Sequence, residues 1–156
     1  MAAATVSKDE ALEHCLRPKS GDPTERWLPR REHFGEMFMA FGVICMPPFR
    51  GLHVELRAAS GRRIVRQDMD LGLWLQDGRV LRRIYQLTIT SGGSFQHMEA
   101  DGTVHTGAHE HIGDRTFALD GLTGARFDVA LRHFCERTNL TLDGSIDDPY
   151  AFRLRG

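Results

Sequence analysis

The sequence predicts an α+β fold, an antiparallel β-meander sheet of five to seven strands with N-terminal helices and one C-terminal helix. Three observations lead to this prediction. Apolar Leu52, Val54 and Leu56 alternate with polar residues, a period typical of half-buried strands. Turn signals such as Asp77-Gly78 separate the alternating stretches, and short turns join only antiparallel strands. Residues 124–138 instead repeat apolar residues at helical spacing.

The first 46 residues are expected to form a helical segment, and residues 47–156 to form the sheet domain with the C-terminal helix. Ser7 and Glu10 make a capping box for a first helix, and Asp22-Pro23 begins a second. Met46-Pro47-Pro48 marks the boundary. The second helix would carry an apolar face that packs on the sheet or, alternatively, docks a protein partner. That face consists of Phe34, Met37, Phe38 and Phe41.

In the second part of the chain the expected elements follow one another at short intervals. The C-terminal helix, expected at residues 124–138, would end at Asn139 as its C-cap. Strands are expected at 52–57, 62–67, 71–75, 80–90 and 116–119, with a histidine hairpin before the last of them. The apolar stripe of the helix is Phe127, Ala130, Leu131, Phe134 and Cys135.

Composition narrows the classes of function. The 156 residues suit one domain with a proper core, and a net charge of -1 argues against bulk binding of a polyanion. Of the 20 basic residues 18 are Arg, which fits a phosphate or nucleic-acid ligand or, alternatively, the codon bias of a GC-rich genome. Three scattered cysteines without a CxxC motif indicate reduced thiols in a cytoplasmic protein. We expect neither a signal peptide nor a membrane span.

The stretch from Phe95 to Arg115 holds four of the eight histidines: His97, His105, His109 and His111. On an extended strand, His109 and His111 would leave the same face while Glu110 points away. If Ala100-Asp101-Gly102 is a three-residue loop with Gly in the left-handed position, His97 lies opposite His105. A two-residue Asp-Gly loop would separate them onto opposite faces.

Three interpretations of these histidines remain open. Converging imidazoles with acidic neighbours could hold Zn or another transition metal. Two imidazoles joined by Arg115 would suit phosphodiester chemistry, with one His as general base, the other as general acid and the guanidinium on the phosphate. A polar, solvent-facing strand is the third interpretation, although four histidines in fifteen residues are rare by chance.

No motif for nucleotide binding of the P-loop or Rossmann type, no GxSxG elbow and no HExxH helix occurs in the sequence. Several short motifs nevertheless resemble those of a set of small, poorly characterised bacterial proteins from prophage and toxin–antitoxin neighbourhoods. Some members of that set are suspected of belonging with the small ribonuclease toxins. The similar residues lie between Val80 and Leu140, and Ala108 stands where members of the set tend to have Pro. The similar residues are Asp101-Gly102, His105, His109, His111, Gly113-Asp114-Arg115, Phe134-Cys135 and Asn139.

This resemblance implies a toxin-like, RNA- or phosphodiester-directed enzyme that needs no metal or other cofactor. In it His109 and His111 would share the acid–base roles, Arg115 would stabilise the phosphorane charge, and His97 or His105 would be accessory. One alternative is a Zn-type domain with His97, His105, His109 and His111 as ligands. Another is a non-enzymatic partner-binding or inhibitor protein of a mobile element, which would use the face from Phe34 to Phe41.

Overall fold

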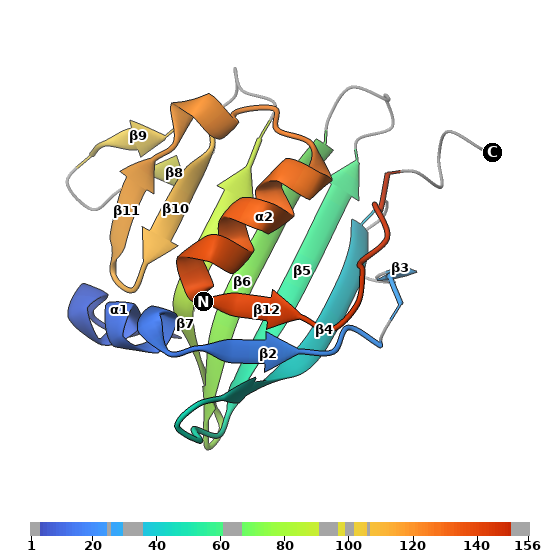
Figure 1. Cartoon of the computed structure of the whole chain (residues 1–156). Helices are drawn as coiled ribbons and strands as arrows, with labels where there is room; N and C mark the ends of the chain where they lie inside the picture. The colour runs from blue at the N-terminus through green and yellow to red at the C-terminus, as the bar shows by residue number, and fades with distance from the viewer. Residues whose placement is uncertain are drawn as a thin grey trace.

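The computed structural model describes residues 4–24, 26–29, 36–60, 67–90, 97–98, 102–105 and 107–150. A ten-stranded, mostly antiparallel sheet curves around two α-helices that lie on one of its faces (Figure 1). The predicted α+β class is thereby confirmed. The strand order along the sheet is β11-β10-β7-β6-β5-β4-β2-β12, with β1 beside β7 and β3 beside β4.

The centre of the sheet is a meander of four long strands, each antiparallel to the next: β4 (Glu36–Cys45), β5 (Leu52–Ser60), β6 (Gln67–Asp77) and β7 (Val80–Ile89). Shorter strands extend it on both sides. They are β1 (Ala4–Thr5), β2 (Lys19–Gly21), β3 (Leu28–Pro29), β10 (His109–Ile112), β11 (Arg115–Ala118) and β12 (Leu140–Leu142). The strands β8 (His97–Met98) and β9 (Val104–His105) form a separate pair. The helices are α1 (Lys8–Leu16), α2 (Phe127–Thr138) and the short 3-10 turn η1 (Asp120–Leu122).

The predicted second N-terminal helix is wrong, because residues 36–45 form strand β4. Phe34 lies outside the described residues, but Met37, Phe38 and Phe41 each pair with a residue of β5. A short, continuous apolar run is compatible with either a helix or a buried strand. Here the pairing with β5 makes it a strand. Among the described residues 4–46, α-helix is limited to α1, so the expected helical segment does not form. Met37, Phe38 and Phe41, three of the four residues proposed as a helix face for a partner, therefore lie on a strand.

Alternation along the meander builds the core. Val54, Leu56, Leu71 and Leu73 are fully buried, and the side chains between them leave the opposite face of the sheet. The helix α2 contacts β6 and β7 on the buried side, where the rings of Tyr85 and Phe134 lie 5.8 Å apart. The sheet therefore has an inner face covered by α2 and an outer face that carries polar side chains.

The buried Lys19 links the ends of both helices. Its Nζ donates hydrogen bonds to the carbonyl oxygens of Thr138 (2.6 Å), Arg17 (2.7 Å) and Cys15 (3.3 Å). A positive charge at two helix C-termini is favourable, because the carbonyl ends carry partial negative charge. Burial lowers the pKa of this ammonium group. Asn139 is the C-cap of α2 in the left-handed conformation, as predicted, and its Nδ2 donates to Leu16 O (2.9 Å).

The start of α1 is held by the turn between β10 and β11. Ser7 Oγ accepts a hydrogen bond from Glu10 N (3.2 Å), which confirms the predicted N-cap. Asp114 Oδ1 accepts another from Lys8 N (3.0 Å). Between these contacts, Gly113 has a φ of +57° and donates through its N–H to Ile84 O (2.9 Å). The histidine strand β10 is thus fixed to α1 at its C-terminal end.

None of the helices among the described residues has both the length and the apolar character needed to cross a membrane.

Replacing Gly113 by Ala is expected to destabilise the fold more than the same change at Gly78. Both residues have a similar positive φ, +57° and +60°, which disfavours a side chain by roughly 1–2 kcal/mol. A Cβ on Gly113 would in addition meet Ser7 O and lie 2.7 Å from Val6 O, whereas nothing lies within 4 Å of one on Gly78. We expect a loss of about 1 kcal/mol for Gly78→Ala and about 3 kcal/mol for Gly113→Ala in urea unfolding. Equal losses would contradict the close packing of this turn against α1.

Candidate functional site

Strand β10 places two imidazoles side by side on the outer face of the sheet. The ring centroids of His109 and His111 lie 5.1 Å apart with their planes at 81°. The predicted paired-histidine surface is confirmed in its geometry. The two side chains are buried, unlike those on a solvent-exposed strand face: His109 is 2% and His111 is 5% exposed. We define these two residues as the imidazole pair.

Each ring of the imidazole pair is held through its Nδ1 atom. His109 Nδ1 lies 3.1 Å from Gly107 O, and His111 Nδ1 lies 3.0 Å from Thr116 Oγ1. A carbonyl oxygen only accepts hydrogen bonds, so His109 Nδ1 must be the donor. When neutral, His109 then carries its lone pair on Nε2. In this tautomer Nε2 is the ring nitrogen that can accept a proton or bind a metal ion.

A carboxylate lies two strands away on the same outer face. His109 pairs with Thr88 on β7, and Thr88 pairs with Asp70 on β6. Thr88 Oγ1 donates a hydrogen bond to Asp70 Oδ1 (2.7 Å). Burial raises the pKa of the Asp70 carboxyl, and the Thr88 hydrogen bond and the positive charge of Arg57 oppose that rise. The surroundings of His109 therefore include an acidic group.

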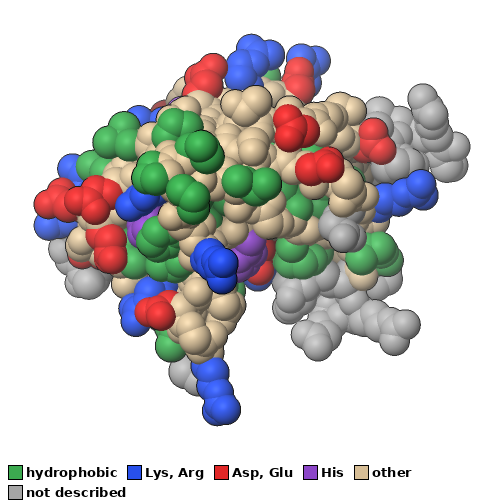
Figure 2. Space-filling model, turned by 60° about the horizontal axis from the view of Figure 1, so that its bottom comes forward, with side chains coloured by type: hydrophobic (Ala, Val, Ile, Leu, Met, Phe, Trp, Pro, Cys, Tyr) green, Lys and Arg blue, Asp and Glu red, His purple; other side chains and the backbone are tan. Residues whose placement is uncertain are grey.

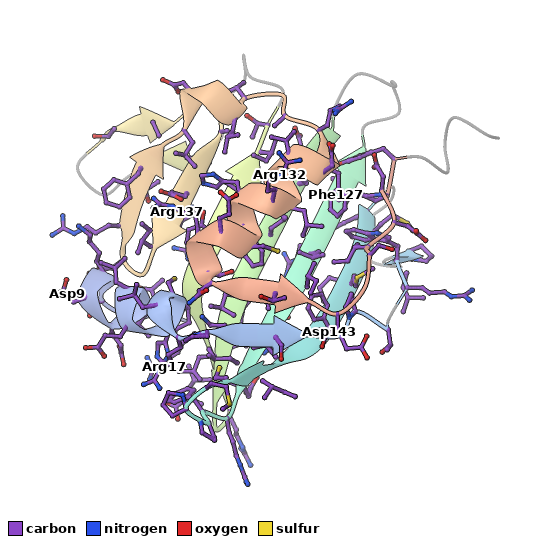
Figure 3. The ribbon with its side chains drawn as sticks, in the orientation of Figure 1. Asp9, Arg17, Phe127, Arg132, Arg137 and Asp143 are labelled. Carbon is purple, nitrogen blue, oxygen red and sulfur yellow. The ribbon has the colours of Figure 1, made fainter. Side chains whose placement is uncertain are left out.

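Glu110 leaves the inner face, as predicted, and is buried there against α2. Tyr85 donates a hydrogen bond to Glu110 Oε2 (2.6 Å), and Arg137 binds both carboxylate oxygens, with Nε 3.1 Å from Oε2. Figure 3 labels Arg137 on the last turn of α2, on the side of β10. His133 Nε2 lies 3.6 Å from the same Oε2. Burial alone would raise the pKa of Glu110, but the hydrogen bonds from Arg137 and Tyr85 outweigh it, so that the pKa lies below its usual value.

Arg115 does not share the face of the imidazole pair, and the prediction that it converges on both rings is wrong. The turn at Gly113-Asp114 pairs Ile112 with Arg115 and His111 with Thr116. Directly paired residues point to the same face, so Thr116 lies with the imidazoles and Arg115 with Ile112 on the opposite side. The exposed Arg115 is thus not positioned to hold a phosphate between the two rings.

The predicted register of the other two histidines is confirmed. His97 and His105 are direct partners in the β8–β9 pair, and Gly102 has the positive φ, +92°, expected of the loop. Their side chains lie outside the described residues. Within the described part of the chain, no group of three or more His, Cys, Asp or Glu side chains could hold a metal ion.

Sequence reasoning missed three residues of this region. Thr116 could have been found, because a two-residue turn at Gly113-Asp114 fixes its pairing with His111. No sequence pattern identifies Tyr85 and Arg137 as partners of Glu110, because these contacts form only when α2 packs on the sheet.

We expect Glu110→Gln to lower the free energy of unfolding by about 1.5–3 kcal/mol at pH 7, the usual worth of hydrogen bonds to a charged group. Because the pKa of Glu110 is lowered in the folded protein, its stabilisation is present above the unfolded pKa of about 4.3 and is lost as the pH falls through the folded pKa. The difference between wild type and variant in urea unfolding should therefore narrow below about pH 4.3. Glu136→Gln, at an exposed carboxylate of α2, is the control. A difference that does not change with pH would contradict the ion pair.

Comparisons of this chain with models of known protein families, with curated proteins and with solved structures find no match. The resemblance to toxin-associated proteins therefore stays a prediction, and the geometry of the imidazole pair is what bears on function.

Proposed function

We propose that this protein binds a transition-metal ion, Zn²⁺ or one of similar preference, with His109 and His111 as two of its ligands. The observation that supports this most directly is the imidazole pair itself, with centroids 5.1 Å apart and each Nδ1 held by an oxygen atom. Metal-binding histidines commonly donate their second ring N–H to a carbonyl or another oxygen, which fixes the tautomer and the orientation of the ring. Gly107 and Thr116 would have that supporting role.

Burial favours an ion over a polynucleotide as the ligand. A phosphodiester must come within hydrogen-bond distance of both an acid and a base, roughly 2.6–3.2 Å. Imidazoles that are 2% and 5% exposed offer little surface for a backbone of that size, whereas a metal ion needs only Nε2 atoms at about 2.0–2.1 Å. The position of Arg115 on the other face removes the expected phosphate ligand. RNA cleavage stays a prediction with less support than metal binding.

We propose His97 and His105 as the remaining ligands. A structural Zn²⁺ site has four ligands in tetrahedral arrangement, and the imidazole pair supplies two. The β8–β9 register makes His97 and His105 neighbours across a hairpin, which suits a second pair. Asp70 would be an acidic neighbour of His109 on the same face without being a ligand.

Zinc should raise the melting temperature of the wild-type protein. An ion present at about 100 times its dissociation constant stabilises the folded state by about 2.7 kcal/mol, or roughly 5–10 °C for a chain of this size. We expect His109→Ala/His111→Ala and His97→Ala/His105→Ala to lose this shift. The second pair of changes leaves β10 intact, so it tests the site even if the first variant is unstable. Differential scanning calorimetry with and without zinc measures the shift.

The control is His53→Ala, which removes a histidine outside the proposed ligand set. His53 lies on the outer face of β5 beside Glu55 (3.4 Å) and, within the described part of the chain, makes no hydrogen bond or ion pair with Glu110. This variant should keep the full zinc shift. A wild-type protein whose melting temperature does not respond to zinc, or an equal loss of the shift in the control, would overturn the proposal.

A further inference from the structure

A buried histidine outside the proposed metal site lies where α1 meets the connection between β4 and β5. His14, near the end of α1, is 5% exposed. Its imidazole meets the ring of Phe49 edge-on, with the ring centroids 4.8 Å apart and the planes at 63°. The guanidinium of Arg17, which Figure 3 labels at the end of α1, lies 5.1 Å from the centre of the same ring. His14 and Arg17 thus join α1 to the connection through one aromatic ring.

The surroundings of His14 suit a neutral imidazole. His14 Nδ1 and Arg17 Nε are buried nitrogens without a hydrogen-bond partner among the residues that the structure describes. A neutral imidazole can leave one nitrogen as an unpaired acceptor, whereas an imidazolium has two N–H donors to satisfy. A buried donor without an acceptor is unfavourable. Protonation of His14 would therefore destabilise the contact of α1 with Phe49.

Two cations near His14 also oppose its protonation. Arg17 follows it on α1, and the buried Lys19 lies on β2, with Nζ donating to the Arg17 carbonyl oxygen (2.7 Å). The β4–β5 connection contributes a neutral aromatic ring to the contact. Glu10 and Glu13 of α1 are exposed, so water weakens their attraction for an imidazolium. Burial lowers the pKa of His14, and Arg17 and Lys19 lower it further against the opposing effect of the two carboxylates.

We propose that His14 is a pH-sensitive latch: protonation of its imidazole in mild acid releases α1 from Phe49 and loosens this helix before the sheet unfolds. The helix suits this role because it has only nine residues, whereas β5 and β6 pair over their whole length. Short elements with few partners open locally at a lower free energy than the centre of a sheet. The latch does not involve the metal proposed for the imidazole pair, because His14 is not one of its ligands.

Opening of the latch would change the surface of the protein. In Figure 2, which turns the lower side of the molecule forward, histidine covers only small areas among hydrophobic and charged side chains. Release of α1 would expose its inner side, where Ala11 and Cys15 are 0% and 6% exposed. An apolar surface that is covered near neutral pH would thereby become accessible in acid.

The direction of the pH dependence follows from the lowered pKa of His14. The neutral imidazole is present in both the folded and the unfolded protein above the unfolded pKa of about 6.5, so the latch is closed there. As the pH falls from about 6.5 toward the lower folded pKa, the unfolded helix binds the proton more readily. The stability of the α1 contact is therefore lost over this range.

The test follows amide hydrogen exchange in the full chain without zinc, between about pH 7.5 and about pH 5, with rates corrected for the intrinsic effect of pH. We expect the protection of α1, relative to that of β5 and β6, to fall several-fold as the pH drops below about 6.5. His14→Gln has no group that titrates in this range and should remove the fall. Leu12→Gln, at a position of the same helix that is 38% exposed, is the matched control and should keep the fall.

Arg17→Gln gives a second test that keeps the imidazole and removes one neighbouring cation. The loss of α1 protection in acid should be smaller in this variant than in the wild type. Circular dichroism near neutral pH establishes that each variant is folded. Three results would overturn the proposal: relative protection of α1 that does not change with pH, a fall that persists in His14→Gln, and an equal fall in the wild type and Arg17→Gln. Failure of this test would leave the zinc response of the imidazole pair unaffected, and the reverse also holds.

Discussion

The buried carboxylate of Glu110 is the constraint on which the arrangement of the site depends. Tyr85 and Arg137 hold it on the inner face of the sheet, with the Tyr85 hydroxyl 2.6 Å from Oε2. A shift of β10 by one residue would place Glu110 on the outer face and turn an imidazole into the core. Such a shift would also leave the buried hydroxyl of Tyr85 without a hydrogen-bond acceptor, which would destabilise the folded state. The inward carboxylate therefore fixes the outward direction of both neighbouring histidines.

The same strand connects the site to the rest of the fold. At its C-terminal end, Gly113 and Asp114 hold the first turn of α1. The C-terminal end of α1 is joined to that of α2 by Lys19 and Asn139. The helix α2 in turn supplies Arg137 to Glu110. These contacts run from β10 through α1 and α2 and back to β10, so the orientation of the imidazole pair depends on helices that contact the other face of the sheet.

Local signals in the sequence predicted much of this arrangement. The capping box at Ser7, the C-cap at Asn139 and the pairing of His97 with His105 each follow from residue types within a few positions. Strand β4 was predicted as a helix because its apolar run has no decisive period, and only its pairing with β5 makes it a strand. Arg115 was predicted to join the imidazoles, but the turn at residues 113–114 pairs it with Ile112 and so places it on the opposite face.

The motif that suggested ribonuclease toxins acquires physical roles in the structure that require no catalysis. Gly113 and Asp114 form a tight turn against α1, Phe134 packs on Tyr85, and Asn139 ends α2. Of that motif, the imidazole pair is the part whose described geometry supports the proposed metal site. The contacts of His109 Nδ1 with Gly107 and of His111 Nδ1 with Thr116 orient both rings before any ligand binds. This lowers the entropic cost of ordering the rings on binding.

The most direct measurement of the central claim is a long-range ¹H–¹⁵N correlation spectrum of the histidine rings, recorded before and after one equivalent of zinc. The account predicts that His109 is protonated at Nδ1 without metal, as its contact with Gly107 O requires, and that zinc shifts the Nε2 resonances of His109 and His111. Resonances of these two rings that stay unchanged, while those of His53 or His133 move, would contradict it.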